Sequence, residues 1–443
     1  MNSFSARTVA RFAFVGLGLF ASAGCSADAD EDLGADVGTT SDGIRSGQIA
    51  IHFDPHQRIH YGYDIKQDGR AQFLNNDRAQ EIFGTDQFDL IRIPVFAFAA
   101  HPSADHVQGS EYDAIVNAVR RAQTVQPNVE VFASLRLDGN RSFPGWVMNA
   151  GHVQPDTYAH LLVDFLQYMQ SQGIRVDYLG PDNESVFNGG DITAARFAEV
   201  VQSLTQRCHT SSIPVPQIVG NDAYSPTEGA QFLGALRSQS HFSLLDVAGV
   251  HYYSKHRTAD YRQTMFQFGS LSRPLPRWDT EFHWNDEIGH GEFADAQLGI
   301  MAALDNTDLG VSNITWWAYN PRSNGTMTAY LHSAIVRATV HAQPLTTIDE
   351  DGAPLAQGRF NSRAFLQGHD VTLVVVNDTG NNFANRLVGI QGKQFDHAVT
   401  FERWRSGSVA GTPGAAEAYP SAGVFRMDFP AQSATFVRIP NIH

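Results

Sequence analysis

Between about residues 61 and 336, short runs rich in apolar and β-branched residues alternate with longer stretches of helical periodicity. Such alternation predicts parallel strands joined by helical crossovers. The runs that predict strands are 61–65, 90–95, 129–135, 176–180, 217–220, 245–251, 276–280 and 311–316. The stretches that predict helices include 111–123, 155–172, 193–208 and 293–306.

Eight strands of this kind predict a (β/α)8 barrel of the TIM type, closed on itself. A doubly wound open sheet is the structural alternative. It offers no reason for polar side chains to follow so many of the strands, so we favour the closed barrel over residues 61–337.

After about residue 337 the pattern changes to strands separated by turns rich in glycine, asparagine and proline, with no helix between them. The runs 371–377, 398–404 and 434–439 predict an antiparallel β-sandwich over residues 338–443. The apolar alternation in 48–53, ahead of the barrel, predicts that residues 47–60 add an N-terminal strand to this sandwich.

The first 25 residues have the pattern of an export signal. Arg7 and Arg11 precede an apolar run over 12–20, which is followed by small residues and Cys25. Two cleavages remain open: one typical of a lipoprotein, with Cys25 lipidated, and ordinary signal-peptidase cleavage. Either one predicts an exported bacterial protein, at the cell surface or secreted.

Residues 26–46 are acidic and rich in small residues, and they predict a disordered tether. Together with the whole chain's formal charge of −15, this argues against nucleic acid or anionic lipid as a partner. We expect membrane contact only through a lipid on Cys25. The folded part retains only Cys208, which excludes a disulfide framework and a cysteine-based zinc site. We expect a monomer.

Two glutamates follow strand-like runs about a hundred residues apart, Glu184 in Leu179-Gly180-Pro181-Asp182-Asn183-Glu184 and Glu281 in Trp278-Asp279-Thr280-Glu281. In a barrel of this type the active site lies at the carboxyl ends of the strands. A retaining glycosidase needs one carboxylic acid and one carboxylate about 5 Å apart. The pair therefore predicts glycosidase chemistry.

Further polar and aromatic residues are predicted at the same ends of the strands. For Arg136 and Asp222 a purely structural role is weighed equally with a functional one. The full set is Arg92, Arg136, Asp138, Asn183, Glu184, Asn221, Asp222, His251, Tyr253, Glu281, Trp316 and Trp317.

These motifs resemble those of clan A glycoside hydrolases, and the architecture resembles family 30, which joins a barrel to a side β-sandwich built from both chain ends. The resemblance covers nearly all of the chain after residue 48. Matching segments are Gln57-Arg58-Ile59-His60-Tyr61-Gly62-Tyr63, Arg92-Ile93-Pro94, Phe143-Pro144-Gly145-Trp146-Val147-Met148, Asn183-Glu184, His251-Tyr252-Tyr253, Thr280-Glu281 and Trp316-Trp317. Ser185 stands where family members usually carry proline after the glutamate.

The resemblance, together with the mechanism of glycosidases that retain the anomeric configuration, implies a role for each of these residues. Glu184 is the predicted acid/base and Glu281 the predicted nucleophile, with Arg92 holding Glu281 ionised. We expect Asn183 to donate to the sugar 2-hydroxyl, and Tyr253 to contact Glu281 or the substrate. His251 is expected to line the site, and Trp317 to form its stacking floor.

Other chemistries lack their motifs. No Gly-x-Ser-x-Gly elbow, phosphate-binding loop or dinucleotide fingerprint occurs, and His251, His256 and His283 have no metal-ligand spacing. We therefore expect neither a cofactor nor a metal. The alternative function is a surface-tethered carbohydrate-binding protein without turnover, but the presence of both glutamates speaks against it. A purely structural role leaves the polar strand ends unexplained.

The sugar, the linkage and endo or exo action stay open. An exported, tethered protein favours an extracellular β-linked polysaccharide or oligosaccharide over a glycolipid. Arg322, after the last strand, is a candidate partner for a substrate carboxylate. The loop around it does not resemble that of a glucuronoxylan-specific enzyme, so this reading carries little weight. For the sandwich we favour packing against the barrel over sugar binding.

Overall fold

The computed structural model describes residues 48–66, 70–137, 143–184, 191–253, 259–283, 292–317, 319–348 and 360–443. The predicted export signal, Cys25, the acidic tether, Asp138, Ser185 and His256 lie outside these ranges. Within the described part, no helix is both long enough and apolar enough to cross a membrane.

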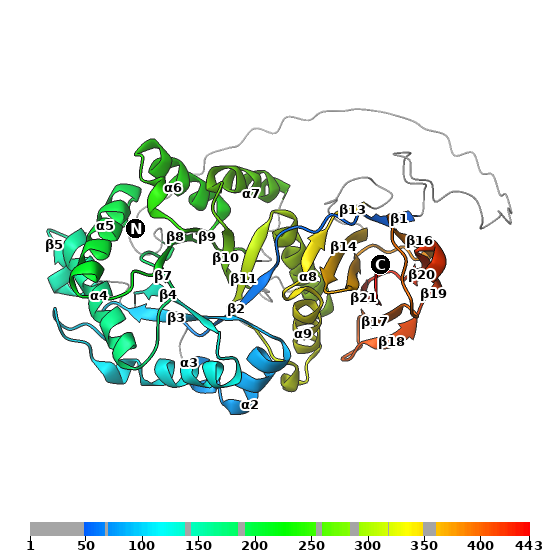
Figure 1. Ribbon diagram of the computed structural model, residues 1–443, viewed down its shortest axis with the longest axis horizontal. Helices are drawn as coiled ribbons and strands as arrows, with labels where there is room; N and C mark the ends of the chain where they lie inside the picture. The colour runs from blue at the N-terminus through cyan, green and yellow to red at the C-terminus, as the bar shows by residue number, and fades with distance from the viewer. Residues whose placement is uncertain are drawn as a thin grey trace, which may run out of the picture. The chain divides into compact units, whose positions relative to one another are not determined.

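Eight parallel strands close into a barrel in the order β10-β11-β2-β3-β4-β7-β8-β9, which confirms the predicted fold (Figure 1). The strands are β2 (His60–Asp64), β3 (Leu90–Phe96), β4 (Glu130–Arg136), β7 (Tyr178–Gly180), β8 (Gln217–Ala223), β9 (Val247–Val250), β10 (Arg277–Phe282) and β11 (Val311–Trp316). The small strands β5 (Met148–Asn149) and β6 (His152–Val153) pair with each other after β4.

Helices follow the barrel strands and surround them (Figure 1). Two short helices, α1 (Arg70–Phe73) and α2 (Asn76–Ala79), come after β2. The longer ones are α3 (Asp113–Val125), α4 (Pro155–Ser171), α5 (Ala194–Thr210), α6 (Pro226–Ser238), α7 (Ala259–Ser272), α8 (Glu292–Asp308) and α9 (Met327–Thr339). All four helices predicted by range are present.

The starts of α4 and α5 follow local rules. Proline opens α4 at the position where its missing N–H costs nothing, and the side chain of Thr193 caps α5 by accepting from the Arg196 N–H. Cys208 is buried on α5, where burial raises the pKa of its thiol to about 11.

Four strands, β3, β4, β8 and β10, extend beyond the predicted ends, and this changes the position of site residues. Strand β4 continues to Arg136, so this residue lies inside it. Strand β8 continues to Ala223, so Asn221 and Asp222 lie inside it. Strand β10 continues to Phe282, so Glu281 lies within the strand and not after it. A side chain on a strand has a fixed direction, which favours an exact placement of Glu281.

An apolar layer fills the barrel beneath the carboxyl ends of the strands. It consists of Leu90, Phe132, Tyr178, Val219, Val247 and Trp278, contributed by six different strands. The Trp278 ring lies 4.5 Å from that of Tyr178, between centroids, and the Arg92 guanidinium lies 5.5 Å above the Phe132 ring. The charged groups described below therefore lie over a layer of apolar side chains.

The C-terminal part forms two sheets. A six-stranded sheet has the order β12-β14-β15-β21-β17-β18, and a five-stranded sheet the order β13-β1-β16-β20-β19. The strands are β1 (Gln48–Ile51), β12 (Gln343–Leu345), β13 (Thr347–Ile348), β14 (Phe360–Gln367), β15 (Asp370–Asn377), β16 (Phe383–Ile390), β17 (Thr400–Arg405), β18 (Thr412–Ala415), β19 (Glu417–Tyr419), β20 (Val424–Phe429) and β21 (Ser433–Ile439).

The N-terminal strand joins the sandwich as predicted, with one antiparallel and one parallel neighbour. Strand β1 pairs antiparallel with β13 and parallel with β16, so the sandwich is not wholly antiparallel. Ile49 and Ile51 point into the sandwich core, and the other two residues of β1 are half-buried.

The six-stranded sheet packs against the barrel through α8 and α9. Phe365, Val374 and Phe436 belong to the same apolar cluster as the barrel helices. Arg363 on β14 forms an ion pair with Asp308 at the end of α8, with 2.6 Å between the charged atoms.

Candidate active site

The two predicted catalytic glutamates converge at the carboxyl end of the barrel. Glu281 comes from β10 and is buried, whereas Glu184 follows β7 and keeps about a fifth of its side chain exposed. One carboxylate oxygen of each and one ring nitrogen of His251 all lie within 4.8 Å of one another. So short a distance is closer to the roughly 5–5.5 Å between the carboxyl groups of retaining glycosidases than to the roughly 6.5–9.5 Å of inverting ones.

The backbone holds Glu184 in an unusual conformation. Its φ of 51° lies in the left-handed region, and its N–H donates to the carbonyl oxygen of Asp222 over 3.0 Å. Asp222 also has a positive φ, of 38°. Such conformations are unfavourable for residues with a side chain and persist where the surroundings fix them, often at functional sites.

Tyr253 links the two carboxylates. Its hydroxyl donates to Glu281 Oε1 over 2.7 Å and lies 3.3 Å from Glu184 Oε1. Burial raises the pKa of Tyr253 well above its ordinary value, and the charges of Glu281 and Glu184 raise it further. The phenol therefore keeps its proton as a donor.

Three cationic or ionisable groups surround Glu281. Arg92 Nη1 donates to its Oε2 over 2.5 Å, Lys66 Nζ lies 3.5 Å away, and His251 Nε2 lies 3.8 Å away. Burial alone would raise the pKa of Glu281. The charges of His251 when protonated, Lys66 and Arg92, with the Arg92 hydrogen bond, hold that pKa well below its usual range. Glu281 is therefore ionised at neutral pH.

Arg92 is the centre of this charged network and is itself buried. Its Nη1 also donates to Asp64 Oδ2 over 2.7 Å. Its Nη2 donates to Asn183 Oδ1 over 2.7 Å and to Ser134 Oγ and Asp222 Oδ2 over 3.1 Å each. Burial would lower the pKa of Arg92, but the charges of Asp64, Asp222 and Glu281 keep it well above its ordinary value.

Asn183 is oriented by two cations. Its side-chain oxygen accepts from Arg92 and from Lys66 Nζ, the latter over 2.5 Å. Since the oxygen faces the cations, the amide nitrogen points away from them. This is the orientation in which an asparagine donates to a hydroxyl group.

His251 lies on the side of Glu184. Its Nδ1 is 2.9 Å from Glu184 Oε1, and the ring is fully buried. With its Nε2 3.8 Å from Glu281 Oε2, His251 lies beside both carboxylates.

Comparisons with known proteins agree with this geometry at the level of the fold. No family model and no curated protein matches the sequence. Among solved structures, a family 30 endoxylanase from Clostridium papyrosolvens matches with a TM-score of 0.67 and 14% identity, covering 89% of this chain and 100% of its own. A family 30 subfamily 8 xylanase from Clostridium acetobutylicum matches with a TM-score of 0.63 and 18% identity, over 89% and 100%.

The chain has the fold of glycoside hydrolase family 30. An endo-β-1,6-glucanase has a similar fold, with a TM-score of 0.59, 15% identity and coverage of 90% of this chain and 96% of its own. Identities this low establish the architecture and leave the activity to be argued from the site.

On this family 30 fold, the two tryptophans after β11 have different surroundings. Trp316 is fully buried, with its ring 4.6 Å from that of Phe282. Trp317 is half-buried and packs near His283 and Tyr253, with ring centroids 4.3 and 6.4 Å away. Trp317 is therefore the one beside the carboxylates.

The other predicted residues have these surroundings. The guanidinium of Arg136 donates to the backbone oxygen of Lys66 and lies over the Phe96 ring. Asp222 accepts from Ser134 Oγ over 2.6 Å as well as from Arg92, and Asn221 is buried. Arg322 stacks on the Tyr330 ring at 4.6 Å.

Sequence analysis missed Asp64, Lys66 and Ser134, which complete the network around Arg92. Asp64 ends β2 and Lys66 follows it, so two charges stand at the carboxyl end of this strand, after the buried residues Tyr61, Gly62 and Tyr63. That pattern is the same signal that identified the glutamates, and it went unused at this strand.

Proposed function

We propose that this protein is a retaining β-glycosidase that hydrolyses an extracellular β-linked polysaccharide or oligosaccharide by double displacement. The observation that carries the proposal is the asymmetry of the two carboxylates. One oxygen of each lies within 4.8 Å of the other, yet only Glu281 is buried beside the cations Arg92 and Lys66.

In the first step, a Glu281 oxygen attacks the anomeric carbon and the bond to the leaving oxygen breaks. Glu184 gives its proton to that oxygen. The product is a glycosyl ester of Glu281 and a free alcohol. Since Arg92 donates to one oxygen of Glu281 and Tyr253 to the other, the carboxylate is held in one orientation for attack.

In the second step, Glu184 accepts a proton from water, and the water oxygen attacks the same carbon. The ester breaks, and Glu281 returns to its ionised form. The configuration at the anomeric carbon is retained because it is inverted twice. His251 stays within hydrogen-bonding distance of Glu184 Oε1 and orients the carboxyl group that exchanges the proton.

Asn183 and Trp317 supply substrate contacts in this proposal. The Asn183 amide is turned so that its nitrogen can donate to the sugar 2-hydroxyl, where hydrogen bonds strengthen in the transition state. Trp317 provides an aromatic face beside the carboxylates for stacking on a sugar ring.

The test measures reducing ends released by residues 47–443 from a panel of polysaccharides that includes xylan and a β-1,6-glucan, and from aryl glycosides. We expect turnover on at least one substrate, and a loss on the order of 10⁴-fold or more in Glu281→Gln. Glu199→Gln, an exposed glutamate on α5, is the matched control.

Product stereochemistry tests the mechanism separately. NMR of the first product formed should show the substrate's anomeric configuration, and an inverted product would refute double displacement. No turnover, combined with binding to one polysaccharide, would instead establish the alternative of a tethered carbohydrate-binding protein.

We also propose that the protein is exported, with either a lipid on Cys25 or ordinary cleavage of the signal. Mass spectrometry of the mature N-terminus distinguishes a lipid on Cys25 from ordinary signal cleavage, and Cys25→Ser should abolish membrane association only in the first case.

A further inference from the structure

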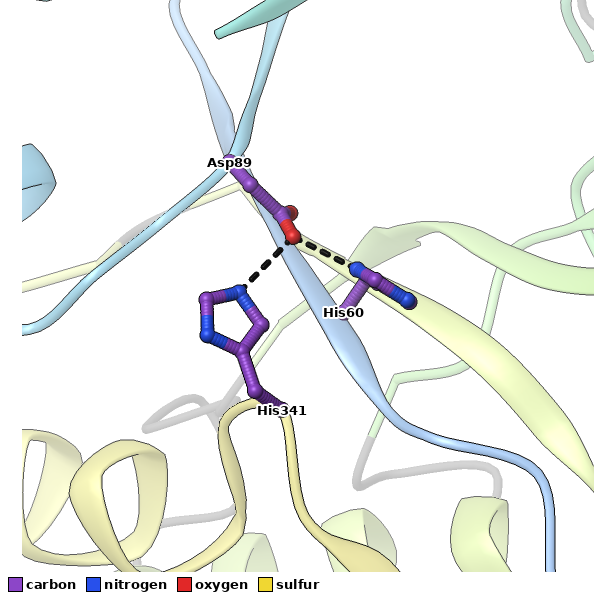
Figure 2. Close-up of side chains that lie close together, drawn as sticks. All are labelled: His60, Asp89 and His341. Atoms are coloured by element: carbon purple, nitrogen blue, oxygen red, sulfur yellow. Dashed lines mark hydrogen bonds and ion pairs between the residues drawn. The ribbon is translucent and has the colours of Figure 1, made fainter. Parts of the chain in front are cut away.

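Three side chains far apart in the sequence meet at the opposite end of the barrel from the glutamates. His60 is the first residue of β2, Asp89 directly precedes β3, and His341 follows α9. Figure 2 shows both imidazoles aimed at one oxygen of Asp89. His60 Nδ1 lies 2.5 Å and His341 Nε2 2.9 Å from Asp89 Oδ2.

The two imidazoles and the carboxylate bring three atoms that can bind a metal close together, with both ring nitrogens in contact with the same carboxylate oxygen. The ligand atoms all lie within 4.8 Å of one another, and the two imidazole rings, 5.6 Å apart between centroids, are tilted by 59°. In a tetrahedral zinc site, bonds of about 2.0–2.2 Å separate neighbouring ligand atoms by about 3.3 Å. The two contacts with Asp89 Oδ2, of 2.5 and 2.9 Å, are shorter than this, so the carboxylate must move away from the imidazole nitrogens when the ion enters.

Backbone hydrogen bonds tie the three segments together beside the ligands. The His341 N–H donates to Ile59 O over 2.8 Å, the Ile59 N–H to Ala342 O over 3.0 Å, and the Asp89 N–H to Tyr61 O over 3.1 Å. His341 itself has a φ of 55°, in the left-handed region, which this pairing maintains. The ligands are thus presented on a fixed frame.

We propose that His60, Asp89 and His341 bind a divalent transition-metal ion, zinc by preference, with water completing the coordination. Imidazole nitrogen combined with one carboxylate suits zinc, whereas calcium and magnesium require mostly oxygen ligands. The side chains are 47%, 20% and 33% exposed, respectively, so an ion and its water have access.

The ion would have a structural role. It would link the starts of β2 and β3 to the segment that leads from α9 to β12, the first strand of the six-stranded sheet. The inference does not depend on the proposed glycosidase activity. Sequence spacing could not indicate this site, because Asp89 is 29 residues from His60 and 252 from His341.

The test is a titration of the metal-free protein with Zn²⁺ against a chromophoric chelator. We expect one tight equivalent in the wild type, weakened more than about tenfold in His60→Gln and in His341→Asn. Asparagine tolerates the left-handed backbone, so His341→Asn removes the ligand and preserves the fold. His160→Ala is the matched control, since His160 pairs with Asp105 over 2.8 Å in a different cluster.

Two further readouts need no catalytic assay. One equivalent of Co²⁺ should give the visible absorption of a four-coordinate ion. Zn²⁺ should also raise the unfolding temperature of the wild type but not of His341→Asn, because a ligand stabilises only the state that binds it. The proposal is overturned if wild type and both ligand variants bind Zn²⁺ equally. It is also overturned if Ca²⁺ stabilises the protein as much as Zn²⁺ does.

Discussion

The two ends of the barrel each hold a cluster of charged side chains, and the clusters differ in burial. At the carboxyl end, the side chains of Arg92 and Glu281 are 0% and 5% exposed. At the other end, His60 is 47% exposed. Where water is excluded, each buried charge is stabilised only by its protein partners, because no water molecule can take the place of a lost partner. Where water has access, a partner can be exchanged, and the same residue types can accept a metal.

The largest effect on stability is expected for Arg92→Met. The substitution leaves Asp64, Asp222 and Glu281 buried without their shared cation, which should lower the free energy of unfolding by about 3–5 kcal/mol. Urea unfolding measures the change. Arg438→Met is the control, because Arg438 pairs with Asp370 at the surface and should cost at most about 1 kcal/mol. Equal losses in the two variants would contradict the comparison.

The pH dependence of activity is the next prediction. The positive charges around Glu281 outweigh its burial and lower its pKa below the ordinary value of 4.5. The nucleophile should therefore stay ionised, and the acid limb of kcat/KM that it governs should lie below pH 4.5. An acid limb that Glu281 governs above that value would contradict the assignment.

The same shift affects stability, with a defined sign. Because the folded-state pKa is lowered, the ionised form of Glu281 stabilises the fold above the unfolded-state pKa. This contribution is lost as the pH falls through the folded-state pKa. Thermal unfolding of Glu281→Gln should therefore depend less on pH in the acid range than that of the wild type.

Lys66→Met tests whether the second cation acts on the nucleophile. Burial lowers the pKa of Lys66, and the Arg92 charge adds to that effect, while Glu281, Asp64 and Asp222 oppose it. Removing Lys66 should move the acid limb of kcat/KM to higher pH and reduce kcat by about tenfold or more. Lys393→Met, on the sandwich, is the matched control. A lower kcat with an unmoved acid limb would indicate a merely structural role.

The smallest effect is expected for Asp89→Asn in metal-free protein. Water can replace the contacts of Asp89 with the two half-exposed histidines, so the free energy of unfolding should fall by less than about 1 kcal/mol. A loss as large as that of Arg92→Met would show that the two ends do not differ in the way their burial implies.

The barrel was predictable because its strands are buried on both faces and stand out as apolar runs between amphipathic helices. The ends of the strands were less certain. Asp222 and Glu281 are polar and yet lie within strands, because the buried Arg92 pairs with both of them. The hydropathy pattern of a single segment does not show such a partner, because the partner belongs to a distant part of the sequence.

The sandwich was predicted only in part. Strands β15, β17 and β21 were recognised. Strand β16 was missed because it is largely exposed or half-buried and lacks a continuous apolar pattern, whereas β20 was missed although most of its residues are buried. The parallel pairing of β1 with β16 depends on contacts between distant parts of the chain. The roles assigned to Glu184, Glu281, Asn183 and the other site residues remain predictions for the experiments above.

The position of β1 also has a consequence for the order of folding. This strand is synthesised before the whole barrel, and its neighbour β16 only after it. The pairing of β1 with β16 therefore cannot form until the barrel and the first strands of the sandwich have been synthesised, and until then only β13 can cover an edge of β1. Pairing of that apolar strand with another chain during this time competes with folding. The protein is therefore most prone to aggregation between the synthesis of β1 and the synthesis of β16.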